Sequence, residues 1–111
     1  MPRKTRSVLV VDDNDVARTV AVHMIRRDPK FRVRGTAASE LEAIDLAGEQ
    51  CPDLVVLDAE MTDDDVIARL RELCPDARIV LWGNDPSTSA GDGFVSKTDP
   101  PERLMDWLRA A

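Results

Sequence analysis

The sequence predicts an α/β protein in which a parallel sheet of five strands is covered by helices on both faces. Apolar, β-branched runs alternate along the chain with segments of helical periodicity, which is the pattern of such folds. The runs VLVV at 8–11 and LVVL at 54–57 are apolar at every position, as strands buried on both faces are. Acidic residues follow both runs directly, and right-handed crossovers between parallel strands bring such strand ends to one edge of the sheet.

Length and composition indicate one globular domain. The chain has 111 residues, of which 43% are hydrophobic and 32% are charged, which is enough for a core of its own. The net charge of −6 argues against general binding to nucleic acid, and no run approaches the roughly 20 apolar residues of a membrane span. The first residues, MPRKTRS, are basic but lack the apolar region of a signal peptide. We therefore expect a disordered basic tail at 1–6 and the domain at 7–111.

Five segments are predicted to be strands. Three of them are continuous apolar runs, and one is the short segment GFVSK. The remaining one, FRVRG, alternates polar and apolar residues as a half-exposed edge strand does. In chain order the strands are expected at 7–11, 31–35, 53–58, 77–82 and 93–97.

Four segments are predicted to be helices, at 14–28, 39–50, 63–73 and 99–110. Apolar residues at helical spacing define one face in each of the first three. These faces consist of Val16, Val20 and Met24, then Leu41, Ile44 and Ala47, and then Val66, Leu70 and Leu73. In the last helix, we expect Asp99 as the N-cap and Pro100 at the first helical position.

Three carboxylates and one lysine are expected to meet at the carboxyl edge of the sheet. Asp12 and Asp13 end the first strand, Asp58 ends the third, and Lys97 ends the last. Like charges placed side by side are unfavourable unless a positive charge lies among them, so the acids form either a solvated loop or half of a cation site. Mg²⁺ prefers oxygen ligands, and a carboxylate can attack phosphorus to form an aspartyl phosphate. We favour a site for a hard cation and a phosphoryl group over acids that only cap loops.

The segments VLVVDDN, PDLVVLDAEM and GFVSK, in this order, resemble the receiver domains of two-component response regulators. The resemblance covers nearly the whole chain, and ARIVLW and DGFVSKTDPPERL are most similar to receivers of the LuxR type. It implies a flavodoxin-like α/β/α fold with strand order 2-1-3-4-5. By the same resemblance, Asp58 is the phosphoacceptor and Lys97 contacts the phosphate. The implied ligands of Mg²⁺ are Asp12, Asp13, Asp58 and the backbone carbonyl of Glu60.

The chain departs from this family in the region that changes on phosphorylation. The family has Ser or Thr at the end of the fourth strand, where this chain has Gly83, which offers no hydroxyl to a phosphoryl group. The next segment, NDPSTSAGDG at 84–93, is rich in Pro, Gly and Ser and has only ten residues. An average helix takes roughly 11–12 residues before its loops are counted. We therefore expect the fourth helix of the family to be shortened or absent.

Two functions remain open. In the first, the chain is a stand-alone receiver that takes a phosphoryl group onto Asp58 from a histidine kinase or a phosphotransfer protein, and an unknown output protein reads the result. In the second, it is a pseudo-receiver, an interaction module that works without phosphorylation. The acids and Lys97 favour the first, whereas Gly83 and the short 84–93 segment favour the second. In neither is the chain an enzyme beyond its own phosphorylation, and a homodimer through the first or last helix is compatible with both.

Two cysteines, Cys51 and Cys74, each lie in a CPD triplet at the end of a predicted helix. The two helices are neighbours, so contact between the cysteines remains open, but buried free thiols are our expectation. So sparse a set of cysteines is typical of the reducing cytoplasm, which we predict as the compartment.

Overall fold

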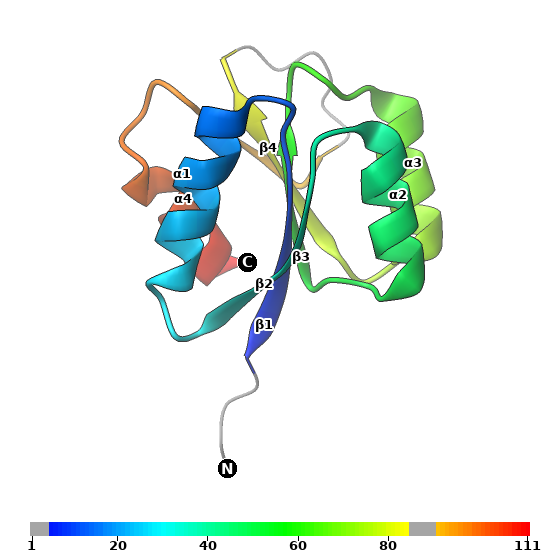
Figure 1. Cartoon of the computed structure of the whole chain (residues 1–111), viewed down its shortest axis with the longest axis horizontal. Helices are drawn as coiled ribbons and strands as arrows, with labels where there is room; N and C mark the ends of the chain where they lie inside the picture. The colour runs from blue at the N-terminus through cyan, green and yellow to red at the C-terminus, as the bar shows by residue number, and fades with distance from the viewer. Residues whose placement is uncertain (1–4, 85–90) are drawn as a thin grey trace.

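A computed structural model describes residues 5–84 and 91–111, and within them helices and strands alternate along the chain (Figure 1). All five strands pair in parallel in one sheet, with the order β2-β1-β3-β4-β5. The predicted sheet and its order are confirmed, and the fold is flavodoxin-like. In chain order the elements are β1 (Arg6–Val11), α1 (Asp15–Arg26), β2 (Phe31–Ala37), α2 (Glu40–Glu49), β3 (Leu54–Asp58), α3 (Asp64–Leu73), β4 (Arg78–Gly83), β5 (Gly93–Ser96) and α4 (Glu102–Ala110).

Helices cover both faces of the sheet, with α1 and α4 on one side and α2 and α3 on the other (Figure 1). Successive side chains of a strand point to opposite faces. In β1, Val8 and Val10 therefore join the core beneath α1 and α4, whereas Leu9 and Val11 join the core beneath α2 and α3. Because both faces of β1 are covered, every one of these positions is apolar.

The side of α1 that faces the sheet differs from the prediction. Val16 and Val20 are 73% and 39% exposed, and the helix buries Ala21 and Ile25 instead. In α2, Leu41 is likewise 70% exposed, whereas Ile44 and Ala47 pack in the core as predicted. The buried residues of α2 are Ala43 and Ala47. Helical spacing was correct in both cases, but spacing alone does not select among several apolar stripes on one helix. In both helices the sheet-facing stripe includes alanine, whose small side chain lets a helix approach the sheet closely.

The other two helices differ in how well they were predicted. In α3, Val66 and Leu70 are buried as expected. In α4, the prediction of Asp99 as N-cap and Pro100 at the first helical position is wrong, because the helix begins at Glu102 and no side chain caps it. A residue that precedes proline is disfavoured in the helical conformation, so the second proline keeps Pro100 outside the helix. None of the helices within 5–84 and 91–111 combines the length and the apolar character needed to cross a membrane.

Two predicted irregular segments lie partly outside the described residues. Of the predicted tail at 1–6, residues 1–4 are not described, and β1 begins at Arg6. Arg6 is tied to the end of the chain, since its guanidinium donates to the Ala111 carbonyl at 2.6 Å. Of the segment 84–93, for which we predicted a shortened or absent helix, residues 85–90 are not described. The flanking residues Asn84, Gly91 and Asp92 are not helical.

Cys51 and Cys74 form a disulfide, with Cα atoms 5.4 Å apart, so the prediction of free thiols is wrong. Cys51 follows α2, and Cys74 is the C-cap of α3. The two helices cover the same face of the sheet, which brings their carboxyl ends together. The bond therefore joins the ends of α2 and α3.

Reducing this disulfide is expected to lower the free energy of unfolding by about 3 kcal/mol. The reason is that the bond joins residues 23 positions apart and so restricts the unfolded chain. Urea unfolding with and without dithiothreitol measures the effect. The double variant Cys51→Ser, Cys74→Ser is the control, because the reductant should leave its midpoint unchanged. Equal midpoints for the wild type in both buffers would contradict the prediction.

Candidate functional site

The carboxyl edge of the sheet brings the three predicted acids together. β1 pairs with β3 so that Val11 lies opposite Leu57, and the next residue of each strand is an aspartate, Asp12 and Asp58. Asp13 follows Asp12, and one carboxylate oxygen from each of the three lies within 4.8 Å of the others. The adjacency of β1 and β3 therefore brings Asp58 beside two acids that precede it by 46 and 45 positions in the sequence.

Two of these carboxylates are buried. Asp12 is 1% exposed and Asp58 is 3% exposed, whereas Asp13 faces solvent. Backbone N–H groups donate to the buried pair: that of Asn14 to Asp12 Oδ1 at 2.9 Å, and that of Glu60 to Asp58 Oδ1 at 3.1 Å. Such charge-assisted hydrogen bonds hold each carboxylate in one orientation.

Lys97 follows β5 and supplies the positive charge. Its Nζ lies 2.8 Å from Asp12 Oδ2 and 3.4 Å from Asp58 Oδ1. Its backbone N–H donates to the Gly83 carbonyl at 2.8 Å, and its ammonium lies 5.2 Å from the centre of the Trp82 ring. Burial acts to lower the pKa of Lys97, but its interactions with the two carboxylates outweigh this and raise the pKa. The lysine is therefore charged.

The cluster has more negative charge than Lys97 balances. Burial raises the pKa of Asp58 to about 7. The Glu60 N–H and the Lys97 charge act in the opposite direction, while the Asp12 charge and a side-chain hydrogen bond that protonated Asp58 makes with the Glu60 carboxylate add to the increase. Asp12 Oδ2 is buried, and the Lys97 ammonium 2.8 Å away is its ion-pair partner. A buried carboxylate oxygen beside two further carboxylates fits a site for a hard divalent cation.

The side chain of Glu60 is part of this site, although the sequence pointed only to its backbone carbonyl. It reaches across to the end of β4, where Glu60 Oε1 accepts the backbone N–H of Asn84 at 2.6 Å. The Glu60 side chain also lies against Gly83. Gly83 is the last residue of β4, so the strand end lacks a hydroxyl, as the sequence predicted. No sequence signal marks this contact, because it depends on the register of β3 against β4.

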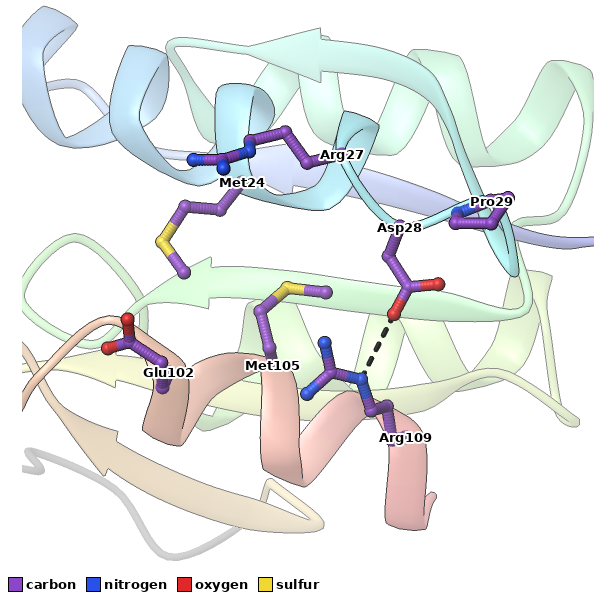
Figure 2. Close-up of a pocket in the computed structure, with 7 residues that line it drawn as sticks. All are labelled: Met24, Arg27, Asp28, Pro29, Glu102, Met105 and Arg109. Carbon is purple, nitrogen blue, oxygen red and sulfur yellow. Dashed lines mark hydrogen bonds and ion pairs between the residues drawn. The ribbon is translucent and has the colours of Figure 1, made fainter.

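A groove of about 470 Å³ lies between α1 and α4, away from the acidic edge (Figure 2). The side chains of Met24 and Met105 extend into it from the two helices. Two of its charges are already paired, since Arg109 Nε donates to Asp28 Oδ2 at 3.0 Å. The Lys30 backbone N–H, together with Arg109, holds the pKa of Asp28 below its usual value. This groove therefore offers no reactive group comparable to the acidic cluster.

Comparison with known proteins points to one family. The chain matches the family model described as the response regulator receiver domain over residues 8–109. The nitrate/nitrite response regulator protein NarL of Escherichia coli K12 is 30% identical, over 95% of this chain and 54% of NarL. The protein-glutamate methylesterase/protein-glutamine glutaminase 1 of Pseudomonas savastanoi pv. phaseolicola is 38% identical, over 66% of this chain and 20% of that protein. The chain thus spans about half of the first relative and a fifth of the second.

Solved structures share the fold over nearly all of the chain. A two-component response regulator of the LuxR family from Aurantimonas sp. SI85-9A1 has a TM-score of 0.85 at 26% identity, covering 96% of this chain and 84% of that one. The response regulator domain of Thermotoga maritima CheB has a TM-score of 0.83 at 22% identity, covering 97% and 96%. The similarity to LuxR-type receivers expected from the sequence is therefore confirmed.

Replacing Asp58 by Asn is expected to stabilise the protein in the presence of a chelator by roughly 2 kcal/mol at pH 8. The folded protein binds the Asp58 proton more tightly than the unfolded chain, because the pKa rises from 3.8 to about 7. The ionised carboxylate therefore lowers stability as the pH rises through this range, and the gain from Asn should disappear near pH 4.

Urea unfolding at the two pH values tests this, with Asp45→Asn as the control because Asp45 is exposed on α2. An Asp58→Asn variant no more stable than the wild type at pH 8 would show that the buried charge carries no such cost.

Proposed function

Because the chain belongs to the family of response regulator receiver domains of two-component systems, we propose that it accepts a phosphoryl group on Asp58. The donor is a histidine kinase or a phosphotransfer protein, the classes with which receiver domains interact. The observation that carries this proposal is the position of Asp58: a buried carboxylate at the end of a central strand, beside Asp12 and 3.4 Å from Lys97.

The reaction requires a carboxylate nucleophile and charge compensation. A carboxylate oxygen of Asp58 attacks phosphorus, and the bond between phosphorus and the donor's nitrogen breaks as the new P–O bond forms. Lys97 then contacts the phosphoryl oxygens. Its ion pair with Asp12 holds the ammonium in position for this contact. The ionised form of Asp58 is the nucleophile, and Lys97 favours this form by lowering the pKa of Asp58.

Receiver domains of this family typically bind Mg²⁺ at an acidic pocket, and the cluster described above fits that ion. We propose Asp12, Asp13, Asp58 and the backbone carbonyl of Glu60 as its ligands. When bound, the ion supplies positive charge that neutralises the oxygens of the transferred group. Asp12 and Asp13 then act by holding the cation, and the buried Oδ2 of Asp12 gains a second positive partner besides the Lys97 ammonium.

Partner contacts are proposed on the surface beside the site. Val16 and Val20 are exposed on α1, and together with Trp82 and Pro101 they line a concavity of about 370 Å³ next to Lys97. Exposed apolar residues around a reactive group suit a protein donor. That the receiver acts alone in the cytoplasm, with a separate output protein, stays a prediction, as does a homodimer through the first or last helix. A reducing cytoplasm would also act against the Cys51–Cys74 disulfide.

A second candidate function is that of a pseudo-receiver, which binds its partner without phosphorylation. The observation that favours it is Gly83 at the end of β4. Receiver domains have Ser or Thr at this strand end, and this chain has no hydroxyl there. Under this function the acidic cluster is retained, but phosphoryl transfer to Asp58 does not occur.

Acetyl phosphate with Mg²⁺ is expected to add one phosphoryl group to the wild type and none to Asp58→Asn. Within residues 5–84 and 91–111, Asp58 alone combines burial at the end of a central strand with the neighbouring acidic pair and Lys97. Intact mass spectrometry measures the gain. The Asp45→Asn control should be labelled like the wild type. Equal labelling of Asp58→Asn would show that the phosphoacceptor is another residue, and an unlabelled wild type would support the pseudo-receiver.

Titration with Mg²⁺ is expected to change the fluorescence of Trp82, because its ring lies beside Lys97. A Trp107→Phe background isolates this signal. In that background, Asp13→Asn should weaken Mg²⁺ binding by about ten-fold, since it removes one negatively charged ligand. Asp45→Asn is again the matched control. Identical curves for the Asp13→Asn variant and its parent would exclude Asp13 from the metal site.

A further inference from the structure

The Glu60 carboxylate lies against Gly83, in space that a Cβ at position 83 would occupy. A Cβ atom built on Gly83 would lie 2.2 Å from Glu60 Oε2 and 2.9 Å from Glu60 Cδ, far closer than real Cβ atoms approach other atoms. The same atom would lie 2.7 Å from the Ala59 Cβ, so any side chain at position 83 would displace the Glu60 carboxylate and shift the chain at Ala59 as well. The absence of a Cβ at position 83 creates the space in which the carboxylate lies.

The contact lies directly beside Asp58. β3 pairs with β4 so that Asp58 lies opposite Trp82, which places Gly83 one residue beyond, at the same edge of the sheet. Two hydrogen bonds fix Glu60 between the end of β3 and the residue that follows β4. Its backbone N–H donates to Asp58 Oδ1 at 3.1 Å, and its Oε1 accepts the Asn84 N–H at 2.6 Å. A carboxylate thus occupies the β4 side of the space into which a group added to Asp58 would extend.

A phosphoryl group on Asp58 would compete with this carboxylate for both space and charge. Such a group adds about −1.5 to −2 charges and three strong acceptor oxygens. Lys97 Nζ lies 3.4 Å from Asp58 Oδ1 and supplies a positive charge, whereas the Glu60 carboxylate brings a negative charge to the same site. The Asn84 N–H is the donor for which the two anions compete.

We propose that the Glu60 carboxylate is an internal substitute for the phosphoryl group, which occupies the Asn84 N–H until phosphorylation of Asp58 expels it. The phosphoryl oxygens then accept the Asn84 N–H, and the Glu60 side chain turns outward. This inference rests on the proposed function of Asp58. A ligand shifts a conformational equilibrium only through contacts that differ between the two states. Gly83 has no hydroxyl to make such a contact with the phosphoryl group, and the exchange at the Asn84 N–H provides one instead. The change is local to Glu60 and Asn84.

Beryllofluoride with Mg²⁺, a mimic of the phosphoryl group, tests the competition. E60A should bind it about ten-fold more tightly than the wild type, because no carboxylate has to be expelled. E60Q should gain less, since it keeps the acceptor but loses the charge. E72A is the control, since it removes an exposed carboxylate on α3 and should bind as the wild type does.

Amide NMR of Asn84 separates this role from a purely structural one. Wild type and E60A should differ at the Asn84 amide before beryllofluoride is added and coincide afterwards, because the same oxygens then accept the N–H in both. A difference of the same size in both states would mean that Glu60 only ties two loops, and would overturn the inference.

The affinities distinguish this inference from the proposed function. Equal affinity of wild type and E60A, or an equal gain in E72A, overturns the inference alone. Binding by E60A but not by the wild type supports it. If neither protein binds beryllofluoride and acetyl phosphate labels neither, the proposed function and the inference both fail.

Discussion

The ammonium of Lys97 lies between two buried carboxylates, and the carboxyl edge of the sheet is organised around this contact. Asp12 comes from the end of β1, Asp58 from β3 and Lys97 from the end of β5, so one interaction connects three strands. One positive charge does not balance this cluster, and burial together with the neighbouring acids raises the pKa of Asp58 to about 7. Desolvated carboxylates left without full compensation are costly, so a site of this kind gains stability from each cation that it binds.

Gly83 shows how one missing side chain changes the neighbours of a reactive group. Glycine at this position lacks the hydroxyl that Ser or Thr provides in other receiver domains. Its lack of a Cβ also opens the space that the Glu60 carboxylate fills. The loss of one contact and the gain of another therefore have the same structural cause. Seen in this way, the departure at position 83 does not by itself make the chain a pseudo-receiver, because a different pair of groups is available to respond to charge on Asp58.

The packing of α1 connects the core with the surface near the site. Ala21 lies against the sheet, and the larger side chains of Val16 and Val20 are turned toward solvent. This orientation places an apolar surface beside Lys97 and Trp82, at the end of the helix that adjoins the acidic cluster. On the opposite face, the Cys51–Cys74 disulfide joins α2 and α3 away from this surface. The face with α1 thus offers exposed apolar residues beside the reactive group.

The sequence by itself determined the order of strands and helices, the parallel sheet and the meeting of Asp12, Asp13, Asp58 and Lys97 at one edge. These follow from local periodicity and from the geometry of parallel crossovers, which act along the chain. The tertiary structure alone decided which stripe of α1 and α2 is buried, that Cys51 meets Cys74, and that Glu60 lies against Gly83. Each of these is a contact between separate elements, and it depends on helix rotation and strand register, which no spacing along the sequence records.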